Sequence, residues 1–225
     1  MTIAMEREYL KLNPARRSCV LQQKENQMKI SIIGAGEIGS AIARQLARSG
    51  IDASIANSRG PQTLQPLVDE LGPRIKAVDL KEAAQADLVF VAVNWNRLPA
   101  ALKDLGPWNG RILVDANNAV EAPSLRPFDL GGRASNEVVA ELAPGARVVK
   151  AFNHLAAAAL EADPKVAGGR RVLFVSGEDA DAKKTVSDLI ARLGFAPIDL
   201  GGVNEGRLVQ FPGGPMAILN LVNLD

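Results

Sequence analysis

The sequence predicts an α/β fold: a doubly wound parallel sheet with helices on both faces and a small C-terminal α/β extension. From residue 28 onward, short apolar or β-branched runs alternate with helical stretches. The run 88–93 shows no polar alternation, as expected for a strand covered by helices on both faces. Hydrophobic residues make up 47% of the 225 positions and charged residues 23%, which is typical of a globular domain.

The alternation places each element of the first part of the chain. The expected strands are 29–33, 53–56, 75–78, 88–93, 112–114 and 148–150. The expected helices are 37–48, 63–71 and 136–142. The segment 119–132 holds two prolines and two glycines, so we expect it to be a surface loop.

The same rhythm continues after residue 152. We expect a helix over 154–161, a strand over 171–175, an amphipathic helix over 180–193 closed by Gly194, and a strand over 196–200. Pro215 suits the first turn of a last helix that begins at Met216. We therefore divide the chain into an extension (1–27), a main domain (28–153) and a small C-terminal portion (154–225).

Composition excludes several classes of site and partner. Cys19 and His154 are the only cysteine and histidine, which argues against a thiolate cluster, a multi-histidine metal site or a Ser-His-Asp triad. The net charge of +1 gives no electrostatic case for nucleic acid or an anionic membrane as a partner. No apolar run approaches the roughly 20 residues that span a bilayer. We interpret 1–27 as a disordered extension or as sequence upstream of a start at Met28, with a targeting arm as the alternative, and expect a cytoplasmic protein.

A glycine motif follows the first strand and opens the first helix. It reads Gly34-Ala35-Gly36-Glu37-Ile38-Gly39, the GxGxxG spacing of dinucleotide-binding folds. In such a motif the first glycine permits a tight turn, the second lets the backbone approach a pyrophosphate, and the third lets helix and strand pack closely. The helix N-terminus then offers free N–H groups to the phosphates. A glycine-rich turn without a ligand is the alternative, and the position at the start of a βαβ series favours binding.

The end of the second strand indicates which dinucleotide is bound. NAD enzymes usually carry an acid there, which accepts hydrogen bonds from the ribose 2′-hydroxyl. Here the strand runs into Asn57, Ser58 and Arg59. Ser58 can donate to a 2′-phosphate and the Arg59 guanidinium can pair with it. The sequence therefore predicts NADP(H), although Arg59 could also be a solvated loop cation.

Polar residues also follow the fourth and fifth expected strands, at the edge where ligands bind in open α/β sheets. Asn94 could reach the cofactor, while Trp95 could wall the nicotinamide pocket or simply pack. One of Asp115, Asn117 and Asn118 is expected to contact the nicotinamide ribose or the substrate, although these residue types are also common in turns.

Taken together, these motifs resemble those of the NADPH-dependent coenzyme F420 reductases, whose F420 is a deazaflavin, and of the oxidoreductase domain of Steap-type ferric reductases. The resemblance runs from residue 28 to about 220. It rests on the glycine motif, on Asn57-Ser58-Arg59, and on four further segments. These are Val149-Lys150-Ala151-Phe152-Asn153, Ser176-Gly177-Glu178-Asp179, Gly194-Phe195 with Asp199-Leu200-Gly201, and Gly213-Gly214-Pro215.

The resemblance implies a hydride transfer between NADPH and a deazaflavin, a flavin or a similar small acceptor. It implies that 35–38 wrap the pyrophosphate and that Ser58 and Arg59 hold the 2′-phosphate. Val93, Asn94 and the segment around Ala157 would flank the nicotinamide. Such a reaction depends on stacking two rings at short distance more than on an acid.

Two departures from the family pattern concern the acceptor. His154 stands where the family usually has Thr, and we expect it either to line the acceptor cleft or to face solvent at the start of a helix. The chain also ends at Asp225, earlier than the deazaflavin reductases. We therefore expect an open cleft, walled by 211–215 and the helix from Met216, or a cleft completed by a second subunit in a homodimer.

Two other functions remain open from the sequence. The first is a non-catalytic NADP(H)-binding module that senses redox state or regulates a partner. The second is a dehydrogenase related to 3-hydroxyacid or imine reductases, which is disfavoured because those enzymes add a long all-helical domain that about seventy remaining residues cannot form.

Overall fold

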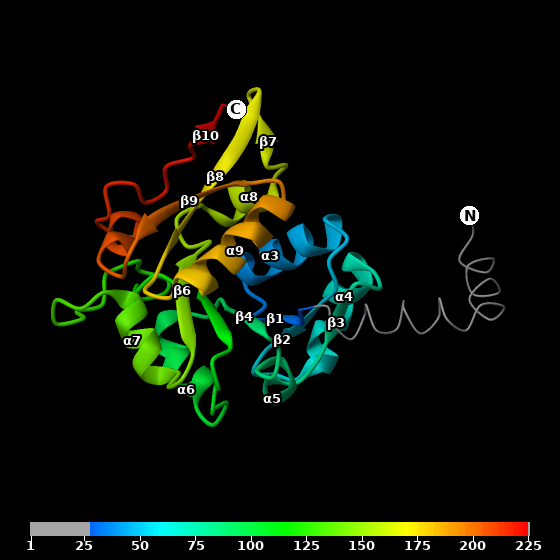
Figure 1. The fold of residues 1–225 in the computed structure, drawn as a ribbon. Helices are drawn as coiled ribbons and strands as arrows, with labels where there is room; N and C mark the ends of the chain where they lie inside the picture. The colour runs from blue at the N-terminus through cyan, green and yellow to red at the C-terminus, as the bar shows by residue number, and fades with distance from the viewer. Residues whose placement is uncertain (1–27, 225) are drawn as a thin grey trace.

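The computed structural model describes residues 28–224, so the expectations for 1–27 lie outside the described residues. A mostly parallel sheet with helices on both faces forms the centre of the molecule (Figure 1). Six strands run parallel in the order β3-β2-β1-β4-β5-β6, the usual order of a dinucleotide-binding fold. They are β1 (Ile30–Ile33), β2 (Ala53–Ala56), β3 (Ile75–Ala77), β4 (Leu88–Val91), β5 (Ile112–Asp115) and β6 (Arg147–Ala151). The predicted fold class is confirmed.

Two buried clusters, one on each face of the sheet, hold the helices in place. The first cluster joins the sheet to α3 (Glu37–Arg48), α8 (Ala157–Glu161) and α9 (Ala180–Arg192). The second joins it to α5 (Leu80–Ala83), α6 (Leu98–Leu102) and α7 (Ser135–Leu142). The short helices η1 (Pro61–Leu64) and η2 (Trp95–Arg97) precede α4 (Gln65–Leu71) and α6. None of the helices within 28–224 has the length and apolar character needed to cross a membrane.

The C-terminal part departs from the expected parallel arrangement. Strand β8 (Gly169–Ser176) runs antiparallel to β6, and β9 (Ala196–Gly201) runs parallel to β8. The reversal follows from a tight hairpin between β7 (Lys165–Val166) and β8, in which Ala167 and Gly168 both have positive φ angles of 51° and 78°. Two successive positive φ angles match a two-residue hairpin turn. This hairpin extends from the body of the molecule in Figure 1.

Two predicted helices need correction. The helix expected over 154–161 begins only at Ala157, because Phe152 has a φ of +65° and Ala156 is extended. The helix expected from Met216 does not form, since Gly213 and Ile218 have φ angles of 100° and 59°. Turns follow η3 (Glu205–Val209) instead, and the chain then adds β10 (Val222–Asn223) antiparallel to β8. The other boundaries agree with the sequence within about two residues.

Candidate dinucleotide-binding site

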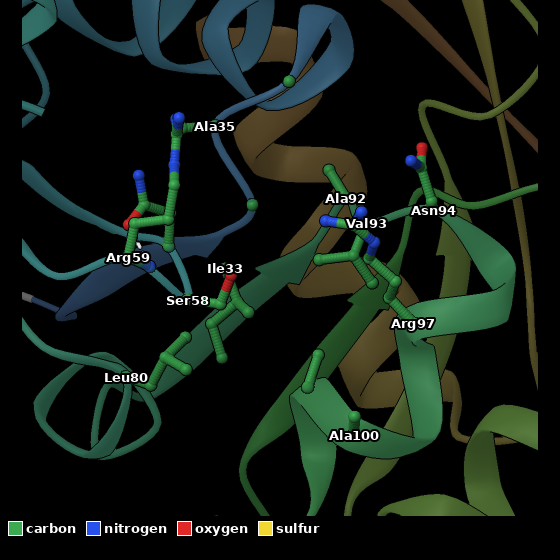
Figure 2. Close-up of a pocket in the computed structure, with 14 residues that line it drawn as sticks. Ile33, Ala35, Ser58, Arg59, Leu80, Ala92, Val93, Asn94, Arg97 and Ala100 are labelled. Carbon is green, nitrogen blue, oxygen red and sulfur yellow. Dashed lines mark hydrogen bonds between the residues drawn. The ribbon is translucent and has the colours of Figure 1, made fainter. Parts of the chain in front are cut away.

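A pocket of about 500 Å³ lies where β1, β2 and β4 reach their carboxyl ends (Figure 2). Pockets at this edge of an open α/β sheet are the usual ligand sites of such folds. The lining comes from the turn after β1 (Ile33, Gly34, Ala35, Gly36), the loop after β2 (Asn57, Ser58, Arg59), the segment after β4 (Ala92, Val93, Asn94, Arg97, Ala100, Ala101) and Leu80 of α5. The structure thus brings together three of the predicted segments.

The three glycines of the turn differ in what surrounds them. Gly34 has a φ of +110°, and a Cβ there would lie 2.0 Å from the Ala92 carbonyl oxygen. A Cβ on Gly39 would lie 1.9 Å from the carbonyl oxygen of Gly34, so helix α3 could not approach β1. Gly36 is extended (φ −80°), and a Cβ there would meet nothing within 4 Å. The protein itself therefore needs Gly34 and Gly39, whereas Gly36 keeps open the space in front of the N-terminus of α3.

The loop after β2 is shaped by Asn57 and leaves its two neighbours accessible. The Asn57 Oδ1 accepts a hydrogen bond from the Arg59 backbone N–H (2.9 Å), and its Nδ2 donates to the Thr63 Oγ1 (2.9 Å). Ser58 and Arg59 are exposed at the pocket, and the Arg59 side chain extends toward Ala35 in Figure 2. Arg59 forms no ion pair within 28–224. Its guanidinium is thus available to a ligand.

A buried polar network fixes the segment after β4. The Val93 backbone N–H donates to the Asn117 Oδ1 (2.8 Å). Asn117 is held by the Asp115 Oδ1, which accepts from its backbone N–H (3.0 Å) and its Nδ2 (2.8 Å). The Lys150 Nζ donates to the Asp115 Oδ2 and to the Asn117 carbonyl oxygen, both at 2.8 Å, and the two charged side chains are almost fully buried. Asp115 and Asn117 therefore position the pocket wall from behind.

Other predicted residues lie outside this pocket. The Asn118 Nδ2 donates to the Asn153 carbonyl oxygen (2.7 Å), and its Oδ1 accepts from the Asn153 Nδ2 (3.1 Å) and the Phe211 N–H (3.0 Å). Asn118 thus joins the C-terminal segment to the sheet edge. Trp95 is 7% exposed and packs in the second core cluster. The other predicted cofactor-binding residues that do not line the pocket are Glu37, Ile38 and Gly39 in the first turn of α3, and Ala157 at the start of α8.

The environment of His154 corrects both expectations for this residue. Its side chain is 1% exposed, so it neither lines an accessible cleft nor faces solvent, and it contacts Phe174 edge-on, with ring centroids 4.9 Å apart. Burial lowers the pKa of His154 from 6.5 to about 4, an effect that the Val172 backbone opposes. The sequence predicted the strand that carries Phe174, but not that this strand runs antiparallel to β6, and so it did not predict that β8 covers His154.

Sequence reasoning missed one charged pocket residue, Arg97. It lies at the end of η2, three residues after Asn94, and it lines the pocket with Ala100 and Ala101 of α6. Arg97 follows the carboxyl end of β4 as Arg59 follows that of β2, and this position is the signal by which the sequence could have identified it.

Comparison with known proteins places this fold in a family. Residues 29–119 match the family described as NADP oxidoreductase, coenzyme F420-dependent. Metalloreductase STEAP3 of Rattus norvegicus is 33% identical over 185 residues, which are 81% of this chain and 36% of the rat protein. The chain thus spans about a third of the length of its curated Steap relatives.

Two solved structures cover most of the chain. A hypothetical protein from Sinorhizobium meliloti is 49% identical, with a TM-score of 0.85, and the match covers 88% of this chain and 97% of that one. A protein from Arthrobacter sp. FB24, provisionally described as an F420-dependent NADP-reductase, is 31% identical, with a TM-score of 0.68, and the match covers 80% of this chain and 88% of that one. The resemblance inferred from the sequence is confirmed, and the chain belongs to the family of coenzyme F420-dependent NADP oxidoreductases.

Proposed function

We propose that the protein binds NADP(H) in the pocket at the carboxyl ends of β1, β2 and β4, and that it transfers a hydride between the nicotinamide and a small planar acceptor. One observation carries the proposal: the open space before Gly36 adjoins an acid-free loop that presents Ser58 and Arg59. A pyrophosphate needs the first feature, and a 2′-phosphate needs the second.

Each contact with the dinucleotide can be assigned to part of the pocket. Residues 34–39 would hold the pyrophosphate, with Gly36 closest and the N-terminus of α3 aimed at it. Ser58 and Arg59 would bind the 2′-phosphate. Val93 and Asn94 would lie at the nicotinamide end, where the Asn117 amide fixes the backbone of Val93. The lining fits a dinucleotide with a 2′-phosphate, because no carboxylate lines the pocket to repel that phosphate.

When bound, the reduced nicotinamide supplies a hydride to the acceptor. The protein's contribution is to hold two rings face to face, and this positioning can account for most of the rate. We assign His154 no role as an acid or base, because its side chain is buried outside the pocket. The residues of the site therefore bind and orient rather than move protons.

The acceptor is proposed to be a deazaflavin such as coenzyme F420, or a flavin. The membership of the family supports this class, and the metalloreductase relatives make a metal chelate, such as a ferric one, the main alternative. The main domain (28–153) would hold NADP(H), and the portion 154–225 would form the acceptor side. The hydrogen bonds from Asn153 to Val209 and from Phe211 to Asn118 bring that portion to the sheet edge that also carries Asn94.

A panel of acceptors tests the proposal. Oxidation of NADPH would be followed with coenzyme F420, FMN, FAD and a ferric chelate, and Gly36→Val would serve as the variant with a blocked site. We expect saturable NADPH oxidation with a deazaflavin or a flavin, and little with NADH. Tight NADPH binding without turnover on any acceptor would contradict the enzyme assignment and favour a redox-sensing or regulatory module. Reduction of the ferric chelate alone would contradict the assigned acceptor class.

A further inference from the structure

The pocket contains one arginine more than the proposed contact with the 2′-phosphate uses. Its fourteen lining residues include two arginines, Arg59 and Arg97, and no aspartate or glutamate. Leu80, Ala100 and Ala101 make much of the remaining surface apolar. Arg59 already has an anionic partner in the proposed function, so the second arginine requires its own explanation.

The position of Arg97 is fixed at its backbone, whereas its side chain is accessible. Trp95 and Leu98 on either side are 7% and 1% exposed and anchor the turn in the core. The Arg97 backbone N–H donates to the Asn94 carbonyl oxygen (2.8 Å). In Figure 2 the Arg97 side chain points toward Val93, on the wall opposite Arg59. Arg97 forms no ion pair with the residues that the structure describes.

A dinucleotide with a 2′-phosphate carries negative charge at two places. The 2′-phosphate belongs at the loop after β2, where Ser58 and Arg59 lie. The pyrophosphate belongs over Gly36, where the N-terminus of α3 supplies the equivalent of only about half a positive charge. Arg97 lies on the β4 side of the pocket, away from the β2 loop, and it provides the charge that the helix end lacks.

We propose that Arg97 binds the pyrophosphate from the wall opposite the glycine turn. The inference rests on the proposed function and deepens it, because it assigns the second anion of the same ligand. Arg59 distinguishes NADPH from NADH, whereas Arg97 binds a group that both nucleotides share. The planar guanidinium can donate two parallel hydrogen bonds to phosphate oxygens, which an ammonium group cannot match.

Binding measurements on Arg97→Gln test the assignment. The probes are NADPH, NADH and 2′-AMP, which has the adenine and the 2′-phosphate but no pyrophosphate, each measured by titration or by competition with NADPH. ADP-ribose, which keeps the pyrophosphate and lacks the nicotinamide, is measured beside them, and an unchanged Kd for ADP-ribose in Arg97→Gln would overturn the assignment by placing Arg97 at the nicotinamide end. We expect the Kd for NADPH and for NADH to rise about tenfold each, as for one charge-assisted contact at a partly exposed site. The Kd for 2′-AMP should not change. Arg97→Lys, which keeps the charge, should lose less affinity than Arg97→Gln.

Arg192→Gln is the matched control, because it removes the same charge from an exposed position on α9 outside the pocket. Unchanged NADPH affinity in Arg97→Gln would overturn the inference. Weaker binding of NADPH and 2′-AMP but not NADH would overturn it by assigning Arg97 to the 2′-phosphate, and an equal loss for all three would assign it to the adenine. A wild-type protein that binds none of the three would instead contradict the proposed function itself.

Discussion

Arg59 is the side chain on which the choice of dinucleotide depends. Replacing Arg59 with Ala removes the proposed cation at the 2′-phosphate and leaves the glycine turn unchanged. We expect the affinity for NADPH to fall by about 1.5 kcal/mol, the lower end for a charge-assisted hydrogen bond because Arg59 is exposed. The affinity for NADH should barely change. Calorimetric titration of both nucleotides checks this, and equal losses for the two would remove Arg59 from the 2′-phosphate site.

His154 makes stability depend on pH. Its folded pKa of about 4 lies below its ordinary 6.5, so the unfolded chain binds the additional proton between these values. The contribution of the neutral His154 to the free energy of unfolding should therefore be fully present above pH 6.5 and be lost as the pH falls toward 4. This lowering of the pKa corresponds to a loss of about 3 kcal/mol in the free energy of unfolding when His154 is fully protonated.

Chemical denaturation of wild type and His154→Leu across this range isolates the effect. We expect the stability difference between the two proteins to shift in favour of the variant as the pH falls. Parallel profiles would show that His154 is not a buried neutral residue in solution.

The position of a residue could be predicted where the local sequence determines it. Ser58 and Arg59 could be placed because they directly follow a strand whose end is fixed by the sheet. His154 and Asn118 could not be placed, because their surroundings come from Phe174 and Phe211, which are distant in the sequence. Arg97 could have been predicted in the same way as Arg59, because it also follows the carboxyl end of a parallel strand.

The turn between β1 and α3 allows a comparison of substitutions within one element. Gly39→Ala would push a Cβ into the Gly34 carbonyl and should destabilise the fold by about 1–3 kcal/mol. Gly36→Val meets open space on an extended backbone, so the free energy of unfolding should stay within about 1 kcal/mol of wild type. The same change should abolish binding of NADPH and NADH, because the side chain occupies the pyrophosphate position. A folded Gly36→Val variant that retains NADPH affinity would exclude this turn from the site.

The buried pair between β5 and β6 supports the pocket from within the sheet. Lys150→Met leaves the Asp115 carboxylate buried without its counter-charge and should cost about 3–5 kcal/mol in the free energy of unfolding. Adding Asp115→Asn should recover part of this loss, because the uncompensated charge is then absent. Urea unfolding of both single variants and the double variant measures the coupling. Additive losses would show that the two groups do not interact in the folded protein.

The apolar periodicity of the sequence was sufficient to predict the helices and strands of the doubly wound part, but not the arrangement of the elements that follow it. Helix 37–48 and strand 53–56 have the bounds that the sequence predicts, because each has a clear apolar period and a turn at its ends. The β7–β8 hairpin was missed because β7 is two residues long and exposed. Its Ala-Gly turn is also a weaker hairpin signal than Asn-Gly.

At the scale of the whole molecule, the reversal of β8 determines the C-terminal architecture. Because β8 runs antiparallel to β6, the chain after η3 returns along the sheet edge, where Phe211 binds Asn118 and the backbone of Ile218 binds that of His154. Strand order in the first half follows from local alternation and right-handed crossovers. The placement of 205–224 depends on these long-range contacts, and no periodicity in the sequence encodes them.

We propose that the pocket binds a dinucleotide that carries a 2′-phosphate. Parallel titration of the wild-type protein with NADPH and NADH, at fixed ionic strength, tests it most directly. Ser58 and Arg59 without a neighbouring carboxylate predict that NADPH binds at least about tenfold more tightly than NADH. Equal affinities, or tighter binding of NADH, would show that Ser58 and Arg59 do not bind a 2′-phosphate.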